Sequence, residues 1–168
     1  MARQVSVLGI SIGTRSMGIA ILRGDVLMRW EMRSFPYTWS PEKLHAIVSA
    51  ITDLITDHSP DLIAIRSPSA QHASIGLELL IKALQKLSTP KGVLIRFCSL
   101  TELKNHYSQK KRMSNRMLRD VTVKLYPELF REYEKEQHYT RPYYTKIFEA
   151  VMAARMCYSK RPEKNSSD

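Results

Sequence analysis

Residues 8–21 read LGISIGTRSMGIAI, two short apolar runs separated by a Gly-Thr turn. Apolar runs of this length, bounded by turn residues, are typical of two β-strands joined in a hairpin. Gly9, Gly13 and Gly18 have no side chain, so the backbone can turn sharply there and other elements can approach it closely. The stretch therefore predicts a buried β-hairpin near the start of the domain.

The chain has 168 residues, the length of one ordinary domain, and its hydrophobic fraction of 43% is sufficient for a buried core. The formal net charge is +10 and the pI is near 9.8. A positive excess of this size favours association with a polyanion such as DNA, RNA or an acidic membrane surface. The alternative is a soluble basic protein with no polyanionic partner.

Cys98 and Cys157 lie in apolar stretches and are too few for a disulfide framework. We therefore expect buried, reduced thiols in a cytoplasmic protein. The histidines have no short-spaced partners, so the sequence contains no zinc signature. The first residues lack a signal-peptide pattern and no apolar run has membrane-spanning length, so we expect no membrane partner.

The rest of the chain alternates between apolar runs of strand length and segments with helical spacing. The expected strands cover residues 4–12, 17–23, 25–33, 62–65 and 93–98, and the expected helices 41–58, 72–88, 99–107, 112–126, 128–136 and 143–159. Ser40 is placed to cap the first helix. A meander followed by strand–helix–strand units predicts an α/β fold, with helices on both faces of a five-stranded mixed sheet. We expect one domain over 1–158 and a polar tail at 159–168.

The order of elements and the opening hairpin resemble the ribonuclease H-like fold, and within it the RuvC-type Holliday-junction resolvases, over residues 5–158. In that family the first strand carries a metal-binding aspartate, and the position of this aspartate is Ser11 here. The sequence PDLIAI at 60–65 looks like the fourth strand, which ends in a catalytic glutamate in the family. The residue at that point is Arg66.

The sequence EAVMAA at 149–154 looks like the closing helix of the family, which usually carries an aspartate at its start. Glu149 is the best match to this aspartate, and a shift of one residue would place Phe148 there instead. A solvated helix residue is the alternative interpretation of Glu149. Sugar kinases and actin-like ATPases share a similar glycine-rich first turn, but they are two-domain proteins of much greater length.

Nucleases of the RuvC type hold magnesium between convergent carboxylates, and the metal activates water and stabilises charge on the phosphate. The resemblance implies that Ser11, Arg66 and Glu149 stand at these positions, a change of three charge units toward positive. A guanidinium repels a divalent metal and offers a bidentate fork to phosphate. We therefore expect a degenerate catalytic site without cofactor, in which two-metal hydrolysis is lost and phosphate binding is favoured.

Two other kinds of chemistry are open from the sequence. Asp25, Glu31 and Asp61 lie near the same strands, and a rearranged acid set of this kind would give an active nuclease that uses Mg²⁺. The sequence GISIG at 9–13 matches the G-x-S-x-G nucleophile elbow of serine hydrolases, which requires a helix after the serine. A second strand is expected there, so we do not expect a serine hydrolase.

Cations are concentrated in one region that contains few acids. The candidate nucleic-acid-binding residues are Lys104, Lys110, Lys111, Arg112, Arg116 and Arg119. The three arginines have the spacing i, i+4 and i+7, which predicts that they share one face of the helix over 112–126. The side expected to be buried consists of Met117, Leu118, Val121 and Leu125. A solvated helix face is the alternative, and in RuvC proteins basic residues of this region contact the DNA backbone.

The RuvC family often carries a base-stacking aromatic residue after the fourth strand, and Ser69 stands at the matching position. The resemblance therefore implies binding through backbone charge and shape, with strong salt dependence. RuvC proteins act as dimers, and the apolar helix over 72–88 is the candidate interface. Taken together, we expect a homodimer that binds branched DNA without cleaving it. An active resolvase and a protein-interaction scaffold are the alternatives.

Overall fold

The computed structural model describes residues 3–13, 15–35, 40–67, 75–108, 112–138 and 143–160. These residues form the strands β1 (Ser6–Ile12), β2 (Ser16–Arg23), β3 (Val26–Ser34), β4 (Leu62–Arg66) and β5 (Leu94–Cys98). The helices are α1 (Pro41–His58), α2 (Ile75–Lys91), α3 (Leu100–Tyr107), α4 (Asn115–Leu125), α5 (Phe130–His138) and α6 (Thr145–Ser159), with a short 3-10 helix η1 (Pro127–Leu129). The order of elements expected from the sequence is confirmed.

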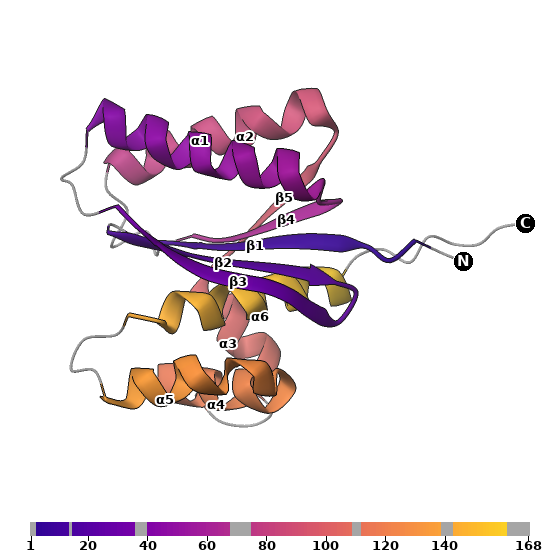
Figure 1. Ribbon diagram of the computed structural model, residues 1–168, viewed down its shortest axis with the longest axis vertical. Helices are drawn as coiled ribbons and strands as arrows, with labels where there is room; N and C mark the ends of the chain where they lie inside the picture. Colours follow the sequence, from indigo (N-terminus) through magenta and orange to yellow (C-terminus); the bar gives the residue numbers. More distant parts are fainter. Residues whose placement is uncertain are drawn as a thin grey trace, which may run out of the picture.

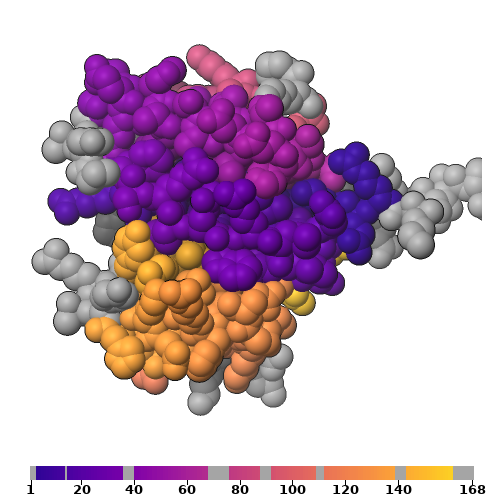
Figure 2. Space-filling view, in the orientation of Figure 1, coloured from indigo at the N-terminus to yellow at the C-terminus, as the bar shows by residue number. Residues whose placement is uncertain are grey.

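The strands form one five-stranded sheet in the order β3-β2-β1-β4-β5. The pairs β1–β2 and β2–β3 are antiparallel, whereas β1–β4 and β4–β5 are parallel. α1 and α2 cover one face of the sheet, and α6 lies against the other, with α3, α4 and α5 beyond it (Figure 1). The predicted α/β class, a mixed sheet with helices on both faces, is therefore confirmed. In the space-filling view β3 crosses the surface between the two helical layers (Figure 2).

Successive side chains of β1 point to opposite faces of the sheet, and helices cover both faces, so the strand is buried on both sides. Leu8 and Ile10 belong to the core beneath α1 and α2, while Val7 belongs to the core around α6. A Cβ atom on Gly9 would lie 2.2 Å from the backbone oxygen of Ala150. The backbone of α6 therefore rests directly on β1, which is the close approach that the glycine pattern predicts.

The expected boundaries hold for α1 and fail for α2. Ser40 caps α1, since its side chain accepts a hydrogen bond from the backbone N–H of Lys43. α2 continues to Lys91 instead of ending at residue 88. It ends where Gly92 adopts a φ of +63°, a left-handed conformation that favours glycine after a helix. None of the described helices has both the length and the hydrophobicity needed to cross a bilayer.

α4 begins later than expected, at Asn115, because the Ser114 side chain accepts a hydrogen bond from the backbone N–H of Met117 and caps the helix. The expected buried side is partly wrong as well. Leu118 is buried, but Met117 and Leu125 are each 40% exposed. The reason is that α4 packs through Leu118 and the buried Thr122, so the inward face is rotated away from Met117 and Leu125.

Candidate functional site

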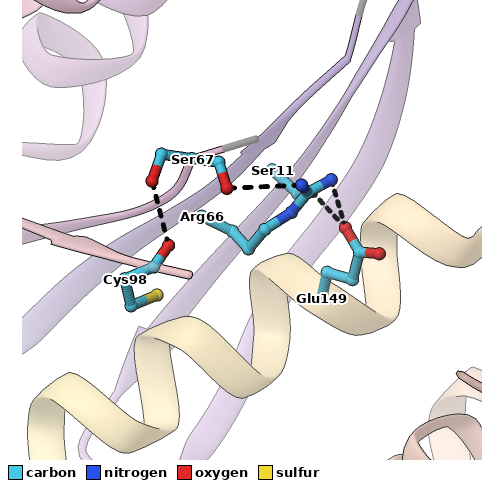
Figure 3. A network of polar contacts seen from close by, with 5 residues as sticks. All are labelled: Ser11, Arg66, Ser67, Cys98 and Glu149. Carbon is cyan, nitrogen blue, oxygen red and sulfur yellow. Dashed lines mark hydrogen bonds and ion pairs between the residues drawn. The ribbon is translucent and has the colours of Figure 1, made fainter. Parts of the chain in front are cut away.

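Ser11, Arg66 and Glu149 meet at one end of the sheet, where β1 and β4 face α6. The parallel register of β1 and β4 places Ser11 directly beside Arg66. The hydroxyl of Ser11 donates a hydrogen bond of 2.6 Å to Oε2 of Glu149, and Nε of Arg66 donates one of 3.1 Å to the Ser11 oxygen. Nη2 of Arg66 lies 2.7 Å from the same Oε2 atom (Figure 3). The three residues thus form one closed polar network.

This network is shielded from solvent. Ser11 is 0%, Arg66 9% and Glu149 5% exposed, so Glu149 is not the solvated helix residue of the alternative interpretation. The register of α6 points Glu149 toward Ser11, whereas Phe148 is fully buried in the apolar core on the same side of the sheet. The structure therefore brings together the three positions that the sequence marks as a degenerate catalytic site.

The guanidinium of Arg66 is paired inside the protein. Besides Glu149 and Ser11 it contacts the backbone oxygen of Ser67, at 3.4 Å from Nη1 (Figure 3). The Nε and Nη2 donors of Arg66 are therefore already engaged by Ser11 and Glu149, and this edge of the guanidinium is not free to bind phosphate. The pairing gives this edge of Arg66 an internal partner, and the expectation that Arg66 binds a phosphate stays a prediction.

The residues at this site do not fit a magnesium centre. Magnesium requires several oxygen ligands, usually including more than one carboxylate. Glu149 supplies one carboxylate, and its Oε2 atom is already engaged by Ser11 and Arg66. Within the described ranges, no group of three or more His, Cys, Asp or Glu side chains is arranged to hold a metal ion.

The structure does not bring together Asp25, Glu31 and Asp61, the rearranged acid set considered from the sequence. Asp61 accepts a hydrogen bond from the backbone N–H of Ser6 and pairs with Arg3, at the other end of the sheet from Ser11. Glu31 pairs with arginines on its own strand, and Asp25 lies 3.8 Å from Arg155. Each of these acids thus has a separate cationic neighbour, and the structure places them at separate points of the sheet.

Lys146 is a member of this site that the sequence reasoning missed. A Cβ atom on Gly13 would lie 2.6 Å from the Lys146 ammonium, so the lysine passes over the end of β1. Burial lowers the pKa of Lys146, the Glu149 carboxylate acts to raise it, and the Arg66 charge lowers it further. The spacing i, i+3 between Lys146 and Glu149 is the sequence signal that could have identified this residue.

The basic residues of the second candidate site separate into two groups. Lys104, Arg112 and Arg116 line a shallow hollow of about 500 Å³ at the start of α4. Arg112 precedes the helix, which corrects its expected place on a shared helical face. Arg119 points elsewhere, with Nη1 3.9 Å from Oε1 of the buried Glu136, and is therefore not part of this hollow. Lys110 and Lys111, like Ser69, lie outside the described residues.

No protein-family model matches this sequence, and no curated protein sequence matches it. Solved structures match nearly the whole chain. RuvC of T. thermophilus in complex with a Holliday junction substrate is 13% identical, with a TM-score of 0.66 and coverage of 92% of this chain and 97% of that chain. Another structure of Thermus thermophilus RuvC is 15% identical, with a TM-score of 0.58 and coverage of 90% and 91%.

The Fowlpox virus resolvase, solved in complex with Holliday junction DNA, is 12% identical to this chain. Its TM-score is 0.59, and the match covers 92% of this chain and 99% of the resolvase. These matches agree with the mixed sheet and the packing of α6 against it. The chain therefore has the ribonuclease H-like fold in the form found in RuvC and the poxvirus Holliday-junction resolvase.

Proposed function

We propose that this protein binds branched DNA and does not cleave it by a two-metal mechanism. The observation that carries this proposal is the buried ion pair between Arg66 and Glu149. This ion pair engages the Glu149 carboxylate that a metal would need, and it places the positive charge of Arg66 beside that carboxylate. A RuvC-like scaffold with this interior retains a basic surface for binding but, among the residues that the structure describes, has no metal-binding set of acids.

The DNA-binding surface that we propose is the hollow formed by Lys104, Arg112 and Arg116. Ser114 caps α4 at this hollow, so the positive end of the helix dipole adds to the three side-chain charges. The chain as a whole carries a net charge of +10. Contacts of this kind are made to the phosphate backbone, and their affinity falls as the salt concentration rises. Two structures with this fold were solved with Holliday junction DNA, which makes a four-way junction the ligand to test first.

The RuvC resemblance also supports a homodimer formed through α2, where Leu79 is 46% exposed. A sedimentation measurement tests this part of the proposal, since Leu79→Lys is expected to shift a dimer toward monomer. DNA recombination or repair is the process in which a junction-binding protein of this kind would act. Free thiols at Cys98 and Cys157 favour a cytoplasmic location for it.

The decisive experiment measures binding and cleavage of a labelled four-way junction by the full chain, with a linear duplex of the same sequence for comparison. We expect binding at low salt that is stronger for the junction, and no cleavage with Mg²⁺ or Mn²⁺. Charge reversal with Arg112→Glu and Arg116→Glu is expected to weaken binding at least tenfold. The matched control is Arg23→Glu with Lys160→Glu, which makes the same charge change at exposed positions outside the hollow.

Two outcomes would replace the proposal by one of its alternatives. Metal-dependent cleavage that Glu149→Gln abolishes would establish an active nuclease. Absence of DNA binding at physiological salt, together with capture of a specific protein partner, would favour an interaction scaffold. Equal binding by the Arg112 and Arg116 variant and by its control would exclude the hollow as the contact surface.

A further inference from the structure

Lys146 occupies an unusual position at the end of β1. It is the second residue of α6 and precedes Glu149 by three residues, so both side chains lie on the side of the helix that faces the sheet. A Cβ atom on Gly13 would lie 2.1 Å from Cε and 2.6 Å from Nζ of Lys146. Contacts this short do not occur between real atoms, so the lysine fills the space that any side chain at residue 13 would need.

The charges at this end of the sheet do not cancel. Glu149 carries one negative charge, and Arg66 neutralises it through a contact of 2.7 Å. Lys146 adds a second positive charge. Within the part of the chain that the structure describes, its ammonium makes no hydrogen bond or ion pair. The excess positive charge of the site is therefore centred on Lys146, not on Arg66.

The environment of this ammonium favours an anionic ligand. Its side chain is partly withdrawn from water, which lowers the pKa of Lys146 although Glu149 acts in the opposite direction. An ammonium that has lost part of its hydration, and that makes no hydrogen bond within the described residues, is stabilised by a negatively charged oxygen. Lysine suits phosphate in this role because it acts as a compact point charge with three donors. A divalent cation, by contrast, is repelled by it.

We infer that Lys146 is the phosphate-binding residue of the site, with the Arg66–Glu149 pair as its support. This inference rests on the proposed function, in which the phosphate belongs to the DNA backbone. It assigns to this end of the sheet a single phosphate contact, in addition to those made by the hollow around Arg112 and Arg116. Gly13 takes part by leaving room for the lysine above the end of β1.

The first test compares Lys146→Gln with Lys160→Gln, a matched control at the exposed end of the same helix. We expect Lys146→Gln to weaken junction binding about three- to tenfold at 0.1 M salt. The slope of log affinity against log salt should fall by about 0.9, the change for one phosphate contact. The control should leave the slope unchanged. Gly13→Ala keeps the positive charge but displaces the flexible end of Lys146, so it should weaken binding by a smaller factor and leave the slope unchanged.

A wild-type slope for Lys146→Gln would overturn the inference. If charge reversal at Arg112 and Arg116 still weakens junction binding, the proposed function stands and only the role of Lys146 is rejected. Thermal melting of each variant shows whether the fold is retained.

A second measurement separates failure of the inference from failure of the proposed function. Inorganic phosphate is titrated into the full chain while the lysine side-chain signals are followed by NMR, and Lys146→Arg identifies the signal of Lys146. We expect phosphate to shift the Lys146 signal and to leave that of Lys160 unchanged. If the wild-type protein binds no junction, the proposed function fails. A shifted Lys146 signal would then still support the phosphate site, and an unmoved signal would overturn it.

Discussion

Nη2 of Arg66, at the end of β4, lies 2.7 Å from Oε2 of Glu149 on α6, and both side chains are nearly buried. The pair joins the sheet to the helix that packs on it, and the Ser11 hydroxyl completes the contact from β1. Taking two charges out of water is costly, and their mutual attraction offsets that cost only while both are present. The polar site between β1, β4 and α6 is thus closed by an internal ion pair.

Removal of one partner of this pair should destabilise the fold. Glu149→Gln leaves the Arg66 guanidinium buried without a counter-charge, and we expect a loss of about 3 kcal/mol in the free energy of unfolding. Urea denaturation measures this loss. The double variant Arg66→Met with Glu149→Leu removes both charges and should lose less than the single variant. A single variant as stable as the wild type would show that the pair is not closed in solution.

Arg116 and Arg119 should behave differently although they are three residues apart on α4. Arg116 is exposed in the basic hollow, so Arg116→Ala should weaken junction binding and leave stability unchanged. Arg119 lies beside Glu136, a buried carboxylate that accepts the backbone N–H groups of Tyr143 and Tyr144. Arg119→Ala should therefore cost about 1 kcal/mol of stability and change binding little. Fluorescence anisotropy and urea denaturation of both variants give the two readouts, and the reverse pattern would contradict this assignment.

Introduction of a metal site at this position should require three substitutions. Ser11→Asp with Arg66→Glu supplies two new carboxylates beside Glu149, but the Lys146 ammonium remains near them and opposes a divalent cation. We expect this double variant to bind Mn²⁺ weakly, and addition of Lys146→Asp to increase the affinity at least tenfold. Calorimetric titration with Mn²⁺ measures both affinities. Equal affinities would show that Lys146 does not oppose metal binding.

Stability should decrease at alkaline pH through Cys98. Burial raises the pKa of this thiol from 9.0 to about 12. Between these values the unfolded chain loses the thiol proton and the folded chain keeps it, so the free energy of unfolding falls as the pH rises. The contribution of one group is at most about 1.4 kcal/mol per pH unit. Urea denaturation from pH 8 to 10.5 should show a smaller decrease for Cys98→Ala than for the wild type, and equal slopes would exclude the effect.

The mixed sheet and the order of its elements along the chain could be predicted because the signals are local. The two apolar runs on either side of Gly13 leave a hairpin as the simplest arrangement, and the later strand–helix–strand units give parallel pairing. The face of α4 could not be predicted in the same way. Met117, Leu118 and Leu125 are all apolar, and only the packing of α4 through Leu118 and Thr122 determines which of them are buried.

The sequence by itself predicted a glycine-containing hairpin and singled out Ser11, Arg66 and Glu149, by resemblance, as one candidate site. Only the tertiary structure decided which group neutralises the charge of Arg66. Ser11 and Glu149 are separated by 138 residues, and packing of α6 on the sheet brings them within 2.6 Å. The energy of a charge depends on its partners and its exposure to water, which are properties of the folded chain. Because Glu149 neutralises Arg66, the excess positive charge of this site lies on Lys146.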